Sequence, residues 1–218
     1  MREPKYKIIY EDEAISVVYK KAGLALASSH VGQMDLVSLL TQYLSRPDCR
    51  QPYLGIVHRL DQPVEGLVVF AKTKEAAAHL SKQAASTDME KIYEARIYGH
   101  LPSDEDIFID YLSKDSKTNM AVKVNEGDEG AKYSKLSYEV VDRDEKTDYV
   151  RIKLYTGRHH QIRAQFAFRD YPLVGDVKYG REDANLFARK EGIRFVCLKA
   201  AQLSFIHPVT NKRVTYTA

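Results

Sequence analysis

Cysteine is scarce in this chain of 218 residues, which has only Cys49 and Cys197. The two lie far apart and have no spacing typical of a zinc site, so we interpret both as reduced thiols of a cytosolic protein. A single disulfide between them is the alternative, although no other feature of the sequence requires it.

Long apolar runs are also missing. No such run follows Met1-Arg2-Glu3-Pro4-Lys5 to form a signal peptide, and no stretch approaches the length of a membrane span. We therefore expect a soluble cytoplasmic protein, with a monomer as the default state. Repeats, low-complexity segments and convincing linkers are absent too, so the sequence predicts one domain over 1–218.

Acidic residues are absent from 150–169, although the formal net charge of the whole chain is only +3. The same stretch contains seven basic or imidazole side chains: Arg151, Lys153, Arg158, His159, His160, Arg163 and Arg169. A run of this kind is typical of a phosphate-binding surface. A solvated basic face is the alternative for this run alone.

Short apolar segments predict strands at 7–10, 14–20, 67–70, 91–98, 132–141, 149–155, 196–205 and 213–216. In the segment 149–155, apolar residues alternate with Arg151, Lys153 and Tyr155, which indicates one core face and one charged face. Helices are predicted at 36–44, ending near Arg46-Pro47, at 74–86, and from His159 or His160 to about 169. The segment 113–130 is interpreted as a hairpin or flexible loop.

This succession of strands with inserted helices lacks regular βαβ alternation. It predicts an α+β fold, with a mixed, largely antiparallel central sheet and flanking helices and loops.

The segment Gly55-Ile56-Val57-His58-Arg59-Leu60-Asp61-Gln62-Pro63-Val64-Glu65-Gly66-Leu67 carries the first candidate site. It places Asp61 at a turn that leads into an apolar strand. A carboxylate anchored in this way is both well held and accessible, as a catalytic group should be. On this segment alone, a turn-capping role for Asp61 is an equal alternative.

Two further segments carry candidate side chains. In Lys91–Gly99, Tyr93 lies on a predicted strand and could stack on a base, although packing is the alternative. Gly157–Arg163 puts donors at the start of a predicted helix, where backbone N–H groups also attract anions. Adjacent residues diverge on a helix, and no cysteine or acid is near, so His159 and His160 favour hydrogen bonding or phosphate contact over a metal site.

Together with Gly175-Asp176-Val177-Lys178-Tyr179-Gly180, these segments resemble the RluA-type family of RNA pseudouridine synthases. Weaker similarities occur at 20–24 and 207–210, so the resemblance covers nearly the whole chain. Some members of the family carry a separate small N-terminal RNA-binding domain, for which we expect no room in this chain. Five positions depart from the usual pattern: Lys21, Gln62, Val64, Glu65 and His159.

The resemblance implies a pseudouridine synthase-like fold that acts on structured RNA, ribosomal or transfer, with no cofactor and no metal. It assigns the essential carboxylate to Asp61 and implies a pairing of Asp61 with Arg163. Tyr93 would stack on the flipped uracil, and Arg59 would fill the vacated space. The full set of implied substrate-binding residues is His58, Arg59, Tyr93, His160, Gln161 and Arg163.

Several alternatives stay open. Asp61 could attack the ribose covalently or abstract a ribose proton. The chain could instead be a catalytically inactive RNA-binding protein of the same fold, or a ribonuclease that uses Asp61 with His58, His159 and His160. A metal-dependent hydrolase is disfavoured because the sequence lacks ligand spacing.

Overall fold

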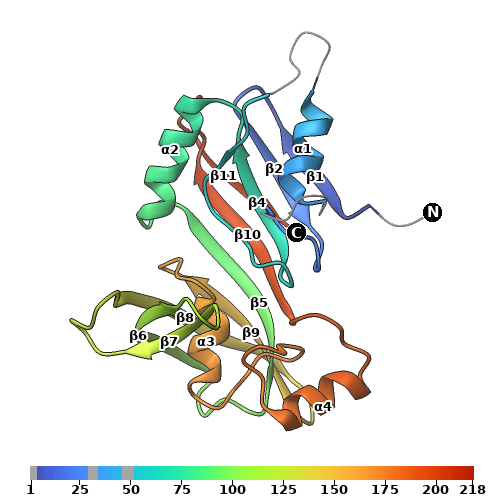
Figure 1. Cartoon of the computed structure of the whole chain (residues 1–218), viewed down its shortest axis with the longest axis vertical. Helices are drawn as coiled ribbons and strands as arrows, with labels where there is room; N and C mark the ends of the chain where they lie inside the picture. The colour runs from blue at the N-terminus through green and yellow to red at the C-terminus, as the bar shows by residue number, and fades with distance from the viewer. Residues whose placement is uncertain (1–3, 29–33, 46–51) are drawn as a thin grey trace. The chain divides into compact units, whose positions relative to one another are not determined.

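The computed structural model describes residues 4–28, 34–45 and 52–218. The chain packs as two compact units (Figure 1). We call Met1–Glu90 with Ala200–Ala218 the terminal unit, and Lys91–Lys199 the central unit. The expected single domain stays a prediction, because compact packing does not show whether either unit folds alone.

The terminal unit is built on a sheet with the strand order β1-β2-β4-β10, in which β11 pairs with β10 and β3 pairs with β4. The first two strands, predicted at 7–10 and 14–20, form an antiparallel hairpin. The strands are β1 (Tyr6–Glu11), β2 (Ile15–Lys20), β3 (Gly55–Ile56), β4 (Glu65–Ala71), β10 (Leu198–Ile206) and β11 (Arg213–Thr217).

Strand β4 is the core strand of this unit. Every residue from Gly66 to Ala71 is buried, so the strand predicted at 67–70 is present and is covered on both faces. Its neighbour β2 runs antiparallel to it and is also almost entirely buried. An apolar cluster includes Val17, Val69, Leu80 and Phe205 from β2, β4, α2 and β10. The strand that leaves the Asp61 segment is therefore rigidly held.

Two helices of the terminal unit match the sequence predictions. Helix α1 (Leu36–Leu44) begins after Asp35, whose carboxylate accepts a hydrogen bond from the backbone N–H of Ser38. Helix α2 (Lys74–Ala85) begins after Thr73, whose hydroxyl accepts from the N–H of Ala76. Helix α1 ends at Leu44, and the predicted stop at Arg46-Pro47 lies outside the described residues.

The segment 207–210, which weakly resembles the family pattern, connects two turns of the terminal unit through His207. The Nε2 atom of His207 lies 2.8 Å from the Asp12 carboxylate, in the turn between β1 and β2. Its Nδ1 atom accepts from the N–H groups of Val209 and Thr210. Because Nδ1 is an acceptor, Nε2 carries the proton and donates to Asp12. His207 therefore fastens one turn of the sheet to another.

The central unit is built on an antiparallel sheet with the strand order β5-β9-β8-β6-β7. Its strands are β5 (Glu90–Tyr98), β6 (Glu105–Asp115), β7 (Met120–Val124), β8 (Lys132–Arg143) and β9 (Thr147–Leu154). Strand β9 alternates between buried and more exposed residues, as predicted from 149–155. The largely antiparallel strand pairings and the helices confirm the predicted α+β class.

Helix α3 (Gln161–Ala167) is shorter than the helix predicted from His159 or His160 to about 169. It packs on the sheet through Phe166, whose ring centroid lies 5.0 Å from that of Phe108 and 5.6 Å from that of Tyr138. This aromatic cluster fixes the helix that carries Arg163.

A buried polar network fastens the same helix to β6. Asp110 of β6 accepts hydrogen bonds from Gln165 at 2.7 Å and from Arg169 at 2.8 Å, and it pairs with Lys123 at 2.9 Å. Burial alone would raise the pKa of Asp110, but these hydrogen bonds outweigh it and hold the pKa below its usual value. The helix is therefore held by charge as well as by apolar packing.

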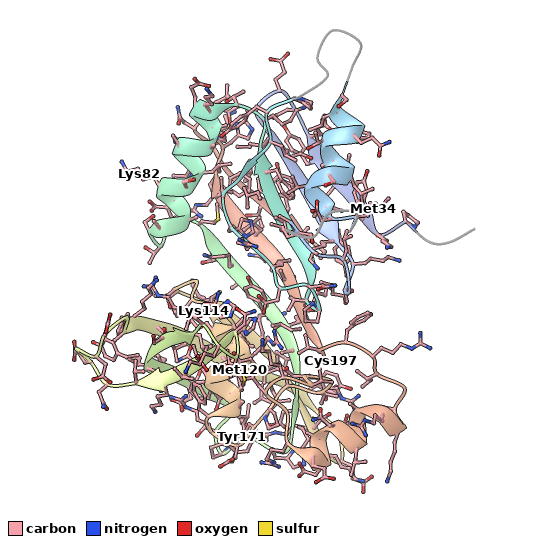
Figure 2. The ribbon with its side chains drawn as sticks, in the orientation of Figure 1. Met34, Lys82, Lys114, Met120, Tyr171 and Cys197 are labelled. Atoms are coloured by element: carbon pink, nitrogen blue, oxygen red, sulfur yellow. The ribbon has the colours of Figure 1, made fainter. Side chains whose placement is uncertain are left out.

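The sequence predictions missed three elements: the two-residue strand β3, strand β6 and helix α4 (Glu182–Lys190). The segment 113–130 forms the end of β6, a hairpin turn, all of β7 and the following turn, so the hairpin interpretation is confirmed. Within the described residues, no helix is long and apolar enough to cross a membrane. Cys197, half-buried just before β10 (Figure 2), forms no disulfide with any described residue, and Cys49 lies outside them.

Candidate active site

The first candidate motif forms the loop that connects β3 to β4 in the terminal unit. Asp61 is half-buried in it, and its carbonyl oxygen accepts a hydrogen bond from the N–H of Val64 at 3.1 Å. This bond closes a tight turn with Gln62 and Pro63 at its centre. The predicted turn is present, and it leads directly into β4.

The ammonium group of Lys20 fastens this turn to the segment after β2. Its Nζ atom donates to three backbone carbonyls: Leu24 at 2.9 Å, Gln62 at 3.1 Å and Lys21 at 3.3 Å. Two of these acceptors lie in the segment 21–24, and the third directly follows Asp61. One buried side chain therefore joins two loops that are about 40 residues apart in sequence.

Lys20 also places a cation beside Asp61. Its side chain is 0% exposed, and burial lowers its pKa to about 8. The nearby carboxylates of Asp61 and Glu65 oppose that shift, because they favour the charged form of the lysine. Sequence reasoning missed this residue, although a lysine at the end of the apolar run Ile15–Tyr19 was an available signal.

Two of the unusual residues in the loop have defined partners. The side chain of Gln62 donates to the carbonyl of Gly23 at 3.1 Å, and the N–H of Gly23 donates back to the carbonyl of Gln62 at 2.9 Å. Glu65 forms a hydrogen bond with Tyr19, which together with burial raises the pKa of Tyr19 to about 12. These departures from the family pattern are thus accommodated by local hydrogen bonds.

His58 fastens the other end of the loop to the sheet. Its Nε2 atom accepts a hydrogen bond from the backbone N–H of Val69 in β4, at 3.1 Å. In the neutral ring the proton then lies on Nδ1. This contact gives His58 a structural task in addition to the predicted contact with substrate. The next residue, Arg59, is exposed.

Residue 66, which follows the loop, must be glycine because of its backbone conformation and its close approach to another strand. Its φ angle is +121°, and a Cβ atom added there would lie within 2.5 Å of the backbone nitrogen of Ala200 and closer still to its carbonyl oxygen. Any side chain would push β4 away from β10 at this point. Close backbone approach therefore fixes where the loop ends.

In the central unit, Tyr93 occupies β5 opposite Ile152 of β9. Its ring belongs to the buried face of the strand, and the residue is 6% exposed. Its position on a paired strand gives the ring a defined orientation. The role of base platform stays a prediction.

The paired histidines lie just before α3 and not within it. His160 adopts a left-handed conformation with φ of 52°, and its ring stacks on that of His159, with centroids 3.8 Å apart. The argument that adjacent side chains diverge on a helix was therefore wrong for this pair, because the helix begins one residue later. Even so, the described residues contain no group of three potential metal ligands.

Gln161 holds this turn together. Its side-chain oxygen accepts from the hydroxyl of Thr156 at 2.8 Å and from the N–H of Arg158 at 3.0 Å, while its amide donates to Gln165 at 3.0 Å. Gln161 is 3% exposed. These contacts support a role in shaping the turn that carries His160.

Arg163 is held by Asp176. Its Nε and Nη2 atoms donate to the two carboxylate oxygens at 2.7 and 2.8 Å, and the guanidinium lies over the ring of Tyr179, 5.2 Å from the ring centroid. The structure thus brings Arg163, His160 and Gln161 together around one short helix. The expected pairing of Arg163 with Asp61 stays a prediction.

Comparison with known proteins identifies related sequences. The family model described as RNA pseudouridylate synthase matches residues 14–168. The dual-specificity RNA pseudouridine synthase RluA of Vibrio parahaemolyticus is 34% identical over 211 residues, which are 94% of this chain and 80% of that protein. Ribosomal large subunit pseudouridine synthase D of Pseudomonas aeruginosa is 37% identical over 175 residues, which are 80% of this chain and 53% of that protein.

The coverage differs among relatives. The chain spans 65% of the length of ribosomal large subunit pseudouridine synthase C from Vibrio cholerae, at 28% identity over 97% of its own residues. Among solved structures, human RNA pseudouridylate synthase domain containing 1 superposes with a TM-score of 0.77 over 98% of this chain and 82% of that one. At 22% identity, that likeness shows the fold alone.

Proposed function

Because the chain belongs to the RNA pseudouridylate synthase family, we propose that it isomerises uridine to pseudouridine in structured RNA. The observation that carries the proposal is the family match over 14–168, which contains both the Asp61 loop and helix α3. The turn of Asp61, fastened by Lys20 and followed by the buried strand β4, suits a group that must meet its substrate in a fixed geometry.

The reaction breaks the bond between ribose C1′ and uracil N1, turns the base, and forms a bond between C1′ and C5. The hydrogen on C5 leaves as a proton and N1 gains one, so the product is an isomer and no redox cofactor is required. In this proposal, Asp61 supplies the carboxylate. Covalent attack and abstraction of a ribose proton are both compatible with its position on the loop.

The other candidate residues serve the same reaction in this proposal. The flipped uracil stacks on Tyr93, which returns roughly 1–3 kcal/mol per base. Arg59 occupies the space that the base leaves, and Arg163 is one of the substrate-binding residues. The contacts of His58 and Gln161 with their own loops support a role for these two residues in holding the site in shape.

The proposed substrate is a uridine in a loop or bulge of ribosomal or transfer RNA, because an unpaired base is the least costly to extrude. Within the basic stretch 150–169, the exposed Arg158 and the half-buried Lys153 supply positive charge for the phosphate backbone. Arg163 and Arg169 are paired with Asp176 and Asp110 instead. We expect the protein to act in the cytoplasm, as a monomer and without cofactor or metal.

The test compares wild-type protein with Asp61→Asn on RNA from cells that lack the gene. Pseudouridines are mapped chemically before and after incubation. We expect the wild type to modify defined positions, and Asp61→Asn to bind RNA but modify none. Asp88→Asn is the matched control, because Asp88 is an exposed carboxylate of the terminal unit that pairs only locally with Ser86.

The same experiment contains the outcomes that contradict the proposal. If the wild-type protein shortens the RNA, the chain is a ribonuclease. If it binds RNA and modifies nothing, it is an inactive RNA-binding protein of this fold. Turnover by Asp61→Asn at the wild-type rate would show that a different group carries the chemistry.

A further inference from the structure

The segment Gly175–Gly180 has no assigned role so far, although its pattern is as distinctive as that of the Asp61 loop. In the structure, two of its residues, Asp176 and Tyr179, contact the guanidinium group of Arg163. The Arg163 residue is 4% exposed and Asp176 is 1% exposed, so the bidentate pair between them lies almost out of contact with water. A buried charge pair of this kind is costly to break, because either partner alone would be left as an uncompensated charge.

The carboxylate of Asp176 is itself fixed by the backbone around it. Its Oδ1 atom accepts from the N–H of Lys178 at 3.0 Å and from the N–H of Tyr179 at 3.2 Å. Its backbone carbonyl accepts from the N–H of Gly180 at 2.7 Å. The segment therefore folds into a tight turn that aims one carboxylate at Arg163, and the carboxylate cannot swing away without losing these bonds.

The two glycines make this turn possible. Gly175 has a φ angle of +79°, and a Cβ atom there would collide with the carbonyl oxygen of Phe195. At Gly180, a Cβ atom would collide with the carbonyl oxygen of Asp176. The pattern of glycine, aspartate, tyrosine and glycine thus follows from the geometry of the turn that holds the carboxylate.

Tyr179 supports the guanidinium from another side. Its ring lies 5.2 Å from the Arg163 guanidinium carbon, a distance at which the ring face attracts a cation. Its hydroxyl accepts from the N–H of Ala121 at 2.6 Å and pairs with Nδ1 of His160 at 2.9 Å. The ring is therefore fixed at its far end by β7 and by the turn before α3.

The division of the Arg163 donors points to a function. The pair with Asp176 uses Nε and Nη2, while a guanidinium has five N–H donors in a rigid plane. Once two of them are fixed to a rigid carboxylate, the direction of the others is fixed as well. We propose that Asp176 is a positioning residue for pseudouridine formation: it holds the plane of Arg163 so that the remaining donors serve the reacting groups.

This inference rests on the proposed function of the chain and on the proposed role of Arg163. The test is Asp176→Asn, which keeps the size of the side chain but removes the charge and one acceptor. The readouts are the single-turnover rate of pseudouridine formation and the dissociation constant of the RNA, both measured well below the melting temperature. We expect the rate to fall about ten- to a hundredfold, while the dissociation constant stays within about threefold.

Asp183→Asn is the matched control. Asp183 also forms a bidentate pair with an arginine, Arg181, but at the surface, with contacts of 3.2 and 3.0 Å. Loss of an exposed pair of this type changes little, so we expect wild-type rates. If Asp176→Asn reacts no more slowly than Asp183→Asn, the positioning role is excluded.

A second comparison covers the case in which Asp176→Asn does not fold. Asp176→Glu keeps the charge but moves the carboxylate by one methylene, and it should lower the rate without weakening RNA binding. A folded Asp176→Glu protein with the wild-type rate would overturn the proposal, because orientation would then not matter.

The route through Arg163 is tested by a double-mutant cycle with Arg163→Lys, which cannot form the bidentate pair. If Asp176 acts through Arg163, the glutamate substitution should slow Arg163→Lys by less than about twofold; full additivity would contradict this route. If the wild-type protein makes no pseudouridine, the proposed function is wrong. If the wild type is active and the Asp176 variants are equally active, only the positioning role of Asp176 is wrong.

Discussion

The Nζ atom of Lys20 lies 2.9 Å from the carbonyl oxygen of Leu24, at the buried end of β2. The same ammonium donates to the carbonyl of Gln62, the residue after Asp61. A fully buried lysine is rare unless its charge is compensated. Here three backbone carbonyls compensate the charge of the Lys20 ammonium, and these hydrogen bonds hold the Asp61 turn in position.

Lys20→Met should destabilise the protein. Methionine fills nearly the same volume as lysine, but it has no N–H donor. The carbonyls that accept hydrogen bonds from the Lys20 ammonium would therefore lose that donor. We expect a loss of roughly 1–3 kcal/mol in the free energy of unfolding, seen as a lower melting temperature. The control is Lys82→Met, because Lys82 projects from the exposed side of α2 (Figure 2). Equal melting temperatures of the two variants would show that the Lys20 contacts do not stabilise the fold.

The pH dependence of stability should carry the signature of Lys20. Its pKa is about 8 in the folded protein and 10.5 in the reference state, because burial disfavours the charged form. Between these two pH values, Lys20 is protonated in the unfolded chain and largely unprotonated in the folded protein. The free energy of unfolding therefore increases as pH rises from about 8 to 10.5. Wild type should therefore gain stability relative to Lys20→Met across this window in denaturant titrations. A constant difference between the two proteins would contradict the shifted pKa.

The fold predictions succeeded where burial leaves a simple pattern in sequence. Strand β9 alternates because one face is core, and β4 is a continuous apolar run because both faces are covered. Strand β6 was missed because Asp110 occupies a buried position while Ile107 and Ile109 are exposed, which inverts the expected pattern. That inversion is stable because Gln165, Arg169 and Lys123 supply partners from elsewhere in the chain, and sequence spacing does not reveal such partners.

Helix α4 was missed for a related reason. Its buried face consists of two small residues, Ala184 and Ala188, so the apolar period is weak. At the candidate site, the Asp61 turn could be predicted from Pro63 and Gly66. The ion pair between Asp176 and Arg163 could not be predicted from the sequence. It joins positions 13 residues apart through a turn whose geometry depends on Phe195.

Gly66→Ala should be among the most damaging small substitutions in the chain. The added Cβ atom would meet the backbone of Ala200, which cannot move without separating β4 from β10, and φ at this position is +121°. We expect a loss of several kcal/mol, seen as poor soluble yield or a sharply lower melting temperature. Gly127→Ala is the control for backbone strain alone, because φ there is +90° and nothing lies within 4 Å of the added atom. That variant should lose only about 1–2 kcal/mol, and equal effects would rule out a steric cause.

Arg59→Ala should separate catalysis from folding. Arg59 is exposed, so its removal should change the free energy of unfolding by no more than about 0.5 kcal/mol. In the wild type, the Arg59 side chain would fill the space left by the flipped uridine and offset part of the few kcal/mol that unstacking costs. Without that side chain the flipped state is less stable, so the single-turnover rate should fall about tenfold. The loss should be smaller on an RNA whose target uridine is already unstacked in a bulge. Arg213→Ala, an exposed arginine of the same unit, is the control. Equal losses of stability and rate in Arg59→Ala would instead indicate a structural arginine.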